Sequence, residues 1–491
     1  MNRLRRPGLV LLLVAFAVIV LIVQLTGLVD RPPGYYVDES SFSWNAWTLA
    51  MAGVDEHGRA WPLFFEAFGD WKTAPYIYLL AAVFAVTGPS ILAARLVSAV
   101  AGVLTVVLLG ALGWRMTRRI EIALLTGAMA LLVPWTFEPT RLAMEVALMP
   151  ALVAGFLLAL HERPPGPGRW SVSVVLLAGV LALLTYTYTL GRLLGPLLAL
   201  GLVVYVNRER WRPVLATWIV YGLLLIPFLL FYVGSPEAAL VRLNEAGYLN
   251  RPLPEVAGTF IAQLLGNLHP WRWLVSGDPN LRHHVPEIGG AMLLGVLVFA
   301  LIGIVVAVRR VRTDAFMRYL LFGLAVSFIP ASLTLDAFHQ HRLIAVPVFV
   351  IALTIPAQDW LLARGASWGG ARKAAFVVLA VAVIAQGAWF QVRYDTVARG
   401  RGGWFDWDYP RLLDLALASG ADPIYLEEGI VPTYIHAYWY GALRGVPVGR
   451  FERLRGNQRA PSGALVLSSV PDCSPCEQLA EGGFYRLYRV P

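Results

Sequence analysis

The chain has 491 residues, of which 58% are hydrophobic and only 14% are charged, whereas soluble domains have roughly 25% charged residues. With a mean hydropathy of +0.63, this composition excludes an ordinary soluble protein and indicates a polytopic membrane protein. The formal net charge of +9 does not require a nucleic-acid partner. Much of the positive charge lies in short loops between apolar runs, where membrane topology explains it.

The first apolar run, residues 8–29, follows Arg3, Arg5 and Arg6. It is as long as a membrane-spanning helix and longer than the core of a signal peptide, so we predict a retained first span. Further apolar runs fall near 91–113, 120–137, 142–160, 170–190, 193–206, 213–233, 289–308, 318–335, 343–362 and 374–391. We therefore predict a mainly α, polytopic membrane protein with about 11 transmembrane helices.

Alternate loops between these runs are basic, as expected for loops that stay in the cytoplasm. Their basic residues are Arg115, Arg118, Arg119, Arg163, Arg169, Arg208, Arg210, Arg212, Arg309, Arg310, Arg312, Arg318, Arg364, Arg372 and Lys373. The alternation requires that residues 74–87 do not cross the membrane. A helix of that length spans roughly 21 Å, less than the ~30 Å hydrocarbon core. We predict a juxtamembrane or re-entrant helix there, on the outer side.

This topology predicts a cell-membrane, multi-pass protein with a cytoplasmic N-terminus. A transmembrane domain over 1–392 would expose a first external loop, 30–90, and a second large one, 234–288. Residues 138–141 and 336–342 would also lie outside. From residue 393 the composition becomes mixed, and PIYLEE and GALVLSS are typical of strands, whereas VPTYIHAYWYGAL is typical of a helix. We predict a small extracytoplasmic α/β C-terminal domain over 393–491.

The two cysteines, Cys473 and Cys476, form a C-x-x-C motif in that C-terminal region. Two cysteines cannot supply the four ligands of a structural zinc site, and an exported compartment favours a disulfide. We predict a local structural bridge rather than a redox-active pair, because no thioredoxin-like pattern surrounds the motif.

Acidic residues at two places in the chain are candidates for a functional site. Asp38 and Glu39 open a helical-looking stretch after the first span, where the simplest role of a carboxylate is to stabilise a helix N-terminus. Glu145 lies near the start of an apolar run, and an acid in a membrane span is costly enough to indicate a functional or paired group. Arg141 precedes it by four residues, so a structural ion pair on one helical face is the alternative.

Basic residues near the predicted outer surface are few. Lys72 precedes the short helix, and Arg342 follows His339 and His341. Such cations can clamp a lipid phosphate, or they can simply extend to the interface. Two histidines at i and i+2 do not share a helical face, which argues against a metal site. Residues 55–57, Asp-Glu-His, are expected to form a polar turn, with chelation of a cation as the alternative.

Three segments carry a resemblance to a known family: VDESSFSWNAWTLAMAG, GDWKTAPYIYLLAAVFAVTG with the helix that follows it, and PTRLAMEVALMPALVA. They resemble the GT-C glycosyltransferases, and within these the branch of the protein O-mannosyltransferases and the aminoarabinose transferases that modify lipid A. The match covers roughly residues 8–160, and HQHRLIAVPVF adds a weaker one. That branch has an acidic pair in its first external loop, a Lys-Pro element before a short helix, an Arg-led helix and a second acid.

The resemblance implies transfer of a sugar from a polyprenyl-phosphate donor to a hydroxyl acceptor on the extracytoplasmic face, usually with inversion. Asp38 would be the general base, supported by Glu39, and Glu145 would bind sugar or acceptor hydroxyls or hold Arg141. Lys72, Arg141 or Arg342 would stabilise the donor phosphate. The further substrate-binding residues that we expect are Asp70, Tyr76, His339 and His341. No metal or cofactor is required, because the leaving phosphate carries its own charge, although a divalent cation is not incompatible with the site.

The expected partners are the donor lipid, membrane lipid and an acceptor that is a glycan, a lipid or a protein. A transporter or flippase for a polyprenyl-linked substrate is the alternative from another class, but the chain shows no internal repeat. An O-antigen ligase or polymerase would share the donor lipid, but the long acidic first loop argues against it. The sequence identifies neither the sugar nor the acceptor.

Overall fold

The structure is a computed structural model that describes residues 6–166, 170–236, 238, 247–336, 338–363, 369–429, 431–455, 458–473 and 475–491. Arg3, Arg5, Arg169 and Arg364 of the predicted charge pattern, and part of the predicted loop 234–288, lie outside these residues. The chain divides into two compact units. Unit 1 comprises Met1–Thr26, Ser98–Arg141 and Glu145–Tyr394, and unit 2 comprises Gly27–Val97, Leu142–Met144 and Asp395–Pro491.

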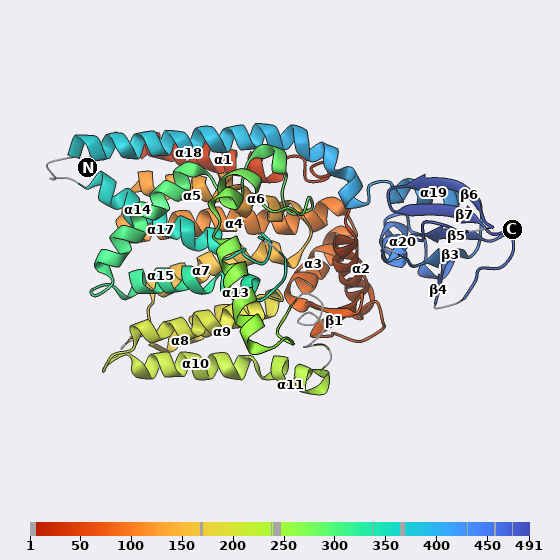
Figure 1. The fold of residues 1–491 in the computed structure, drawn as a ribbon, viewed down its shortest axis with the longest axis horizontal. Helices are drawn as coiled ribbons and strands as arrows, with labels where there is room; N and C mark the ends of the chain where they lie inside the picture. The colour runs from red at the N-terminus through yellow and green to blue at the C-terminus, as the bar shows by residue number, and fades with distance from the viewer. Residues whose placement is uncertain are drawn as a thin grey trace. The chain divides into compact units, whose positions relative to one another are not determined.

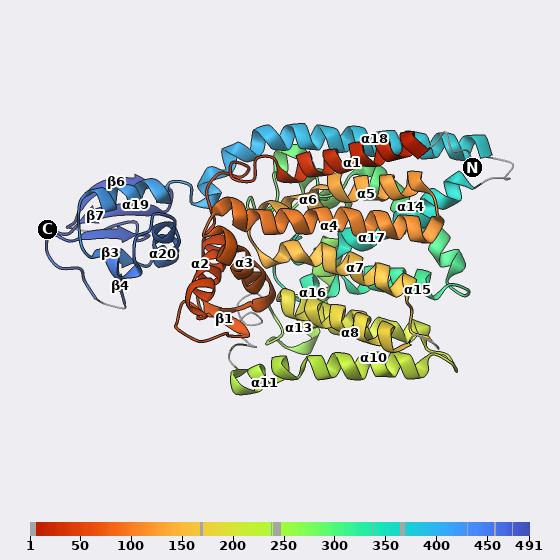
Figure 2. The same cartoon turned by 180° about the vertical axis from the view of Figure 1, so that it is seen from behind.

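Unit 1 consists mainly of helices joined by loops, and its long helices run alongside one another (Figures 1 and 2). Every apolar run predicted from the sequence contains a helix. The elements are α1 (Arg6–Leu25), α4 (Ile91–Thr117, which begins in unit 2), α5 (Ile120–Leu132), α6 (Pro134–Phe137), η2 (Glu138–Arg141), η3 (Glu145–Leu148), α7 (Met149–Glu162), α8 (Trp170–Thr187), α9 (Gly191–Gly201), η4 (Leu202–Tyr205), α10 (Trp211–Leu224), α11 (Ile226–Gly234), α13 (Leu253–Asn267), η5 (Arg272–Ser276), η6 (Pro286–Ile288), α14 (Leu294–Arg310), α15 (Ala315–Val326), α16 (Ile329–Ser332), α17 (Val346–Leu362) and α18 (Gly369–Val397, which ends in unit 2).

Among the described residues, five helices are long and apolar enough to cross a membrane, or up to seven if each bent pair counts as one span. Several others, including α17, are apolar but shorter. The architecture is therefore that of a polytopic helical membrane protein, and the count of about 11 spans stays a prediction. The first span, Pro7–Leu25, is only 11% buried, as expected of an apolar helix that faces lipid.

Proline explains the two sharp bends. The pair α5 and Pro134–Arg141 is bent by 72°, and the pair α10 and α11 by 42°. Pro134 begins α6, and Pro227 stands in the first turn of α11. A proline there cannot continue the preceding helix, because it lacks the N–H group and its ring clashes with the turn before it.

The core of unit 1 is centred on α17, in which every residue from Val346 to Gln358 is buried. Helix α14 packs against it. A Cβ atom at Gly303 would lie only 1.7 Å from the carbonyl oxygen of Leu353. Only glycine permits this close approach of the two helix backbones.

Unit 2 contains α2 (Val37–Ala52), the antiparallel strands β1 (Phe64–Ala67) and β2 (Asp70–Thr73), and α3 (Ala74–Thr87). Helix α3 has the length predicted for the short external helix, with Pro75 in its first turn and Gly88 at its end at φ +73°. The hairpin turn between the strands has Phe68 at φ +58° and Gly69 at φ +76°, the left-handed pair that two-residue hairpins favour.

The rest of unit 2 is an α/β assembly with helices α19 (Tyr409–Ala418) and α20 (Thr433–Leu443). Its five-stranded sheet has the order β4-β3-β5-β7-β6, in which β3 is parallel to both neighbours and the other pairs are antiparallel. The strands are β3 (Ile424–Glu427), β4 (Phe451–Leu454), β5 (Leu465–Ser468), β6 (Glu477–Gly482) and β7 (Tyr485–Arg489). The predicted strands and helix of this region are confirmed, as is the Cys473–Cys476 disulfide. The predicted domain boundaries stay predictions.

Candidate active site

The first turn of α2 carries Asp38 and Glu39, and the two carboxylates have different surroundings. The Glu39 side chain is fully buried, whereas that of Asp38 is 31% exposed. Glu39 also accepts a hydrogen bond from the backbone N–H of Tyr36 at 3.0 Å, which closes the start of the helix as in a capping box. Asp38 is therefore the more accessible of the two carboxylates.

Glu39 is held by a two-pronged ion pair with Arg95, which is also fully buried. Arg95 donates from Nε to Glu39 Oε1 and from Nη2 to Oε2, both at 2.9 Å. The backbone N–H of Ala143 donates to Oε1 at 2.8 Å. A buried carboxylate with this many donors is a fixed structural anchor. The structure thus gives Glu39 a positioning role beside Asp38.

The remaining N–H groups of Arg95 donate to backbone carbonyls of the segment before α2. They reach Pro32 at 2.7 Å, Gly34 at 2.8 Å and Leu28 at 3.0 Å. Sequence reasoning did not single out Arg95 as a site residue. The available signal was an arginine inside the apolar run 91–113, because a charge at such a position is costly and defaults to a partnered or functional group.

Asp38 forms an ion pair with Lys72, whose Nζ lies 2.6 Å from Asp38 Oδ1. The Lys72 side chain is 8% exposed, and its ammonium lies 4.3 Å from the ring centroid of Phe42 and 5.2 Å from that of Phe68. Aromatic faces attract cations, so Lys72 is held in place on several sides.

Phe68 occupies the left-handed conformation at the tip of the β1–β2 hairpin. A bulky residue there is strained, and such strain is found most often at functional sites. In this hairpin the conformation brings the Phe68 ring to Lys72. The strain therefore accompanies a contact that helps to fix the lysine.

A second polar chain in unit 2 links α2 to α20 and was not predicted. Ser40 Oγ lies 2.8 Å from His436 Nδ1, and His436 Nε2 lies 3.3 Å from Asp406 Oδ2. The order of groups is that of a serine-hydrolase triad, but Ser40 and His436 are fully buried. A nucleophile without access to a substrate cannot act, so this chain is a structural tie between the two helices.

Two other predicted substrate contacts in unit 2 are buried. Tyr76 is fully buried, and its hydroxyl donates to the carbonyl of Ala94 at 3.1 Å, which ties α3 to the start of α4. Asp70 is 8% exposed and begins β2. The Tyr76 geometry indicates a packing role, and substrate binding by both residues stays a prediction.

Residues 55–57 form the polar turn that was predicted after α2. Asp55 Oδ1 accepts from the backbone N–H groups of His57 and Arg59 at 2.9 and 2.8 Å. Burial raises the pKa of the Glu56 carboxyl, and His57 and Asn45 offset only part of this shift.

In unit 1, one expectation about Arg141 and Glu145 is wrong. They do not lie one turn apart on a continuous helix, because η2 ends at Arg141, η3 begins at Glu145, and residues 142–144 between them are not helical. Arg141 is 1% exposed and donates to the carbonyls of Gln24 and Thr26 at 2.8 and 2.6 Å. Arg342 forms an ion pair with Asp336.

His339 and His341 lie in a turn before α17, so the helical-face argument against a metal site does not apply to them. The His283 ring lies 4.4 Å from the His339 ring and 4.0 Å from the His341 ring, centroid to centroid. Burial, followed by repulsion from His283 and Arg342, holds the pKa of His339 well below its usual value. A neutral imidazole is the form that binds metal ions.

The neighbouring His284 is fully buried and partnered at both ring nitrogens. Nδ1 lies 2.6 Å from Glu138 Oε2, and Nε2 lies 2.7 Å from the carbonyl oxygen of Gly289. Both partners are acceptors, so both nitrogens must carry protons. Burial opposes this charge, but the Glu138 carboxylate outweighs it and raises the pKa of His284.

The ten predicted site residues are thus divided equally between the two units. Asp38, Glu39, Asp70, Lys72 and Tyr76 belong to unit 2, whereas Arg141, Glu145, His339, His341 and Arg342 belong to unit 1. The structure brings Asp38, Glu39 and Lys72 together, and it brings His339 and His341 together around His283.

The fold of the chain is similar to those of the solved structures of ArnT and AglB, in line with the resemblance predicted from its sequence. It is similar over 98% of both chains to ArnT from Cupriavidus metallidurans in the apo state, with a TM-score of 0.63 and 14% identity. The same protein bound to undecaprenyl phosphate gives a TM-score of 0.61 over the same coverage and identity.

A second similar structure is the archaeal oligosaccharyltransferase AglB from Archaeoglobus fulgidus, in complex with an inhibitory peptide and a dolichol-phosphate. The TM-score is 0.57 at 13% identity, and the match covers 92% of this chain and 65% of AglB. No protein-family model matches the sequence, and no curated protein matches it.

Proposed function

We propose that this protein is an integral membrane glycosyltransferase that moves a sugar from a polyprenyl-phosphate-linked donor to a hydroxyl acceptor on the extracytoplasmic face. The observation that carries the proposal is the similarity to ArnT over 98% of both chains, including ArnT bound to undecaprenyl phosphate. The partly exposed Asp38, held beside Lys72, supplies a carboxylate suited to the chemistry. Residues 393–491 are proposed as a separate extracytoplasmic domain.

The acceptor hydroxyl is a weak nucleophile, so a base must take its proton as the new bond forms. Asp38 accepts that proton. The acceptor oxygen then bonds to the anomeric carbon from the face opposite the phosphate, and the bond from that carbon to the phosphate oxygen breaks. The products are the inverted glycoside and the polyprenyl phosphate, which leaves with the bonding electron pair.

The departing phosphate gains negative charge, which preorganised cations stabilise. Lys72 is the first candidate, because its ammonium has three donors and Asp38 uses one of them. Arg141 and Arg342 remain candidates for the same role, and Glu145 for binding sugar or acceptor hydroxyls. Arg95 acts through Glu39 and is a positioning residue.

The test is mass spectrometry of envelope glycans, lipids and glycoproteins from cells that carry the wild-type chain, the Asp38→Asn variant, or no copy. Glu66→Gln is the matched control, because that carboxylate is 37% exposed and pairs with Arg59. We expect Asp38→Asn to reduce the sugar-modified product about 100-fold or more, and Glu66→Gln to retain it.

Two outcomes would count against the proposal in different ways. If the Asp38→Asn variant forms as much sugar-modified product as the wild-type chain, Asp38 is not the general base. If the envelope is identical with and without the wild-type chain, the proposed transferase activity itself is contradicted. The transporter alternative predicts that the purified protein releases no polyprenyl phosphate from the sugar-linked lipid.

A further inference from the structure

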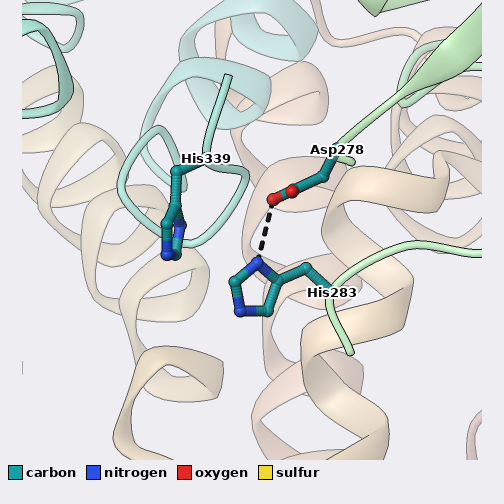
Figure 3. A group of neighbouring side chains, drawn as sticks. All are labelled: Asp278, His283 and His339. Atoms are coloured by element: carbon teal, nitrogen blue, oxygen red, sulfur yellow. Dashed lines mark hydrogen bonds and ion pairs between the residues drawn. The ribbon is translucent and has the colours of Figure 1, made fainter. Parts of the chain in front are cut away.

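Three side chains of unit 1 lie close together, and the reaction steps proposed above give none of them a role. Asp278, His283 and His339 each offer one ligand atom, and these atoms all lie within 4.8 Å of one another. Figure 3 shows the His283 ring directed toward the Asp278 carboxylate, with the His339 ring to the left of both. The Asp278 and His283 side chains are 2% and 11% exposed. The cluster is therefore largely shielded from water.

We propose that Asp278, His283 and His339 form a binding site for a transition-metal ion of the zinc class. Two imidazole nitrogens and one carboxylate oxygen are ligands that Zn²⁺ accepts in proteins. Calcium and magnesium prefer all-oxygen sites, so the donor set selects against them. Three protein ligands leave at least one coordination position for water or another group.

Two backbone hydrogen bonds hold the Asp278 carboxylate in place. Asp278 Oδ1 accepts from the backbone N–H of Asn280 at 2.8 Å, and Oδ2 accepts from the backbone N–H of Gln340 at 2.7 Å. The second bond joins the loop before η6 to the loop before α17. Two of the ligands come from the first loop and one from the second, so a bound ion would cross-link the same two segments.

The histidines are fixed as well. The His341 ring packs at 4.0 Å from the His283 ring, and the next residue, His284, is held by Glu138. The backbone N–H of Arg342 donates to His339 Nδ1 at 3.4 Å, and such hydrogen bonds from outside the ligand shell orient metal ligands. His283 Nδ1 lies 2.9 Å from Asp278 Oδ2, so a hydrogen-bonded pair is the competing interpretation. A bound ion would take the place of that hydrogen bond.

The experiment uses the full chain, purified in detergent, stripped with EDTA and titrated with ZnCl₂ or CoCl₂. Metal content and the visible absorption of bound Co²⁺ are the readouts, and neither depends on transferase activity. The variants are His283→Gln, His339→Gln and Asp278→Asn, the last of which keeps a side-chain carbonyl for one of the two backbone donors. The matched control is His269→Gln, a histidine exposed on the same unit.

We expect one equivalent of metal in the wild-type chain and in His269→Gln. Each ligand variant should bind at least about tenfold more weakly, with a thermal midpoint that no longer rises when Zn²⁺ is added. The site is overturned if the wild-type chain binds Zn²⁺ no more tightly than the His283→Gln/His339→Gln double variant. It is also overturned if His269→Gln loses as much binding as the ligand variants, because a surface histidine would then account for it.

Discussion

Arg95 shows how one buried charge organises the first external segment. Its guanidinium has five N–H donors, and the hydrogen bonds to Glu39 and to the carbonyls of Leu28, Pro32 and Gly34 use all of them. Removal of one partner from such a pair leaves the other charge buried and uncompensated, which costs about 3–5 kcal/mol. Asp38 depends on this framework, because it is the neighbour of Glu39 in the chain.

We predict that Arg95→Ala lowers the free energy of unfolding by about 3–5 kcal/mol and abolishes sugar transfer. Arg95→Lys should recover little, because an ammonium cannot reproduce the planar fork. The matched control is Arg59→Ala, which breaks the exposed pair with Glu66 and should cost less than about 1 kcal/mol. Equal melting temperatures for the Arg95 and Arg59 variants would contradict the prediction.

The burial of Glu56 predicts that the stability of the protein depends on pH. Its side chain is 1% exposed, and burial raises its pKa on folding. Stability linked to this group is therefore full below the ordinary glutamate pKa and is lost as pH rises through the raised value. Glu56→Gln cannot ionise, so its melting temperature should exceed that of the wild-type chain at pH 8, and the difference should vanish near pH 4. A difference in melting temperature that is constant with pH would exclude this linkage.

At the scale of elements, the sequence predicts best where signals are local. Pro75 and Gly88 define the ends of α3. Short apolar stretches define β3, in which burial alternates, and β5, in which every residue is buried. These features depend on backbone conformation and on the side-chain period, which neighbouring residues determine.

The elements that were missed depend on distant contacts. The sequence predicts one apolar run over 142–160, but residues 142–144 are not helical, and the backbone N–H of Ala143 donates to Glu39. That bond joins residues 104 positions apart, so no local pattern indicates it. The histidine cluster is similar, because His283 and His339 come together only through loops whose course depends on the packing of whole helices. The sequence identified Glu39 as a candidate site residue, whereas its partner Arg95 was identified only from the fold.

At the scale of the whole molecule, the loops of unit 1 meet in two groups. Arg119 donates to the carbonyl of Leu362 at 2.9 Å, and Arg318 donates to that of Val204 at 3.0 Å. A single cavity is lined by Arg210, Arg310, Arg312 and Arg318, among others. All of these loops are predicted to be cytoplasmic. Contacts in space therefore agree with the charge pattern along the chain.

The second group contains loops predicted to lie outside. The backbone N–H of Trp135 donates to the carbonyl of Ala291 at 3.1 Å, and its indole N–H donates to that of Gln340 at 3.0 Å. Glu138 accepts from the backbone N–H of Val285 at 3.0 Å. The two groups support a single alternation of sides along unit 1, which in turn requires that α3 does not cross the membrane.

That alternation predicts a cytoplasmic N-terminus and an extracytoplasmic C-terminal region. The only two cysteines are joined to each other, so a single introduced cysteine reports its own position. Thr313→Cys lies in the loop between α14 and α15, and Ala418→Cys ends α19, and both positions are exposed. In intact cells a membrane-impermeant maleimide should label Ala418→Cys and not Thr313→Cys, and both should react after permeabilisation. If Thr313→Cys alone reacts in intact cells, the orientation is inverted. If both react there, the loops do not alternate as the charges predict. A crossing by α3 would instead move both positions to the opposite side together.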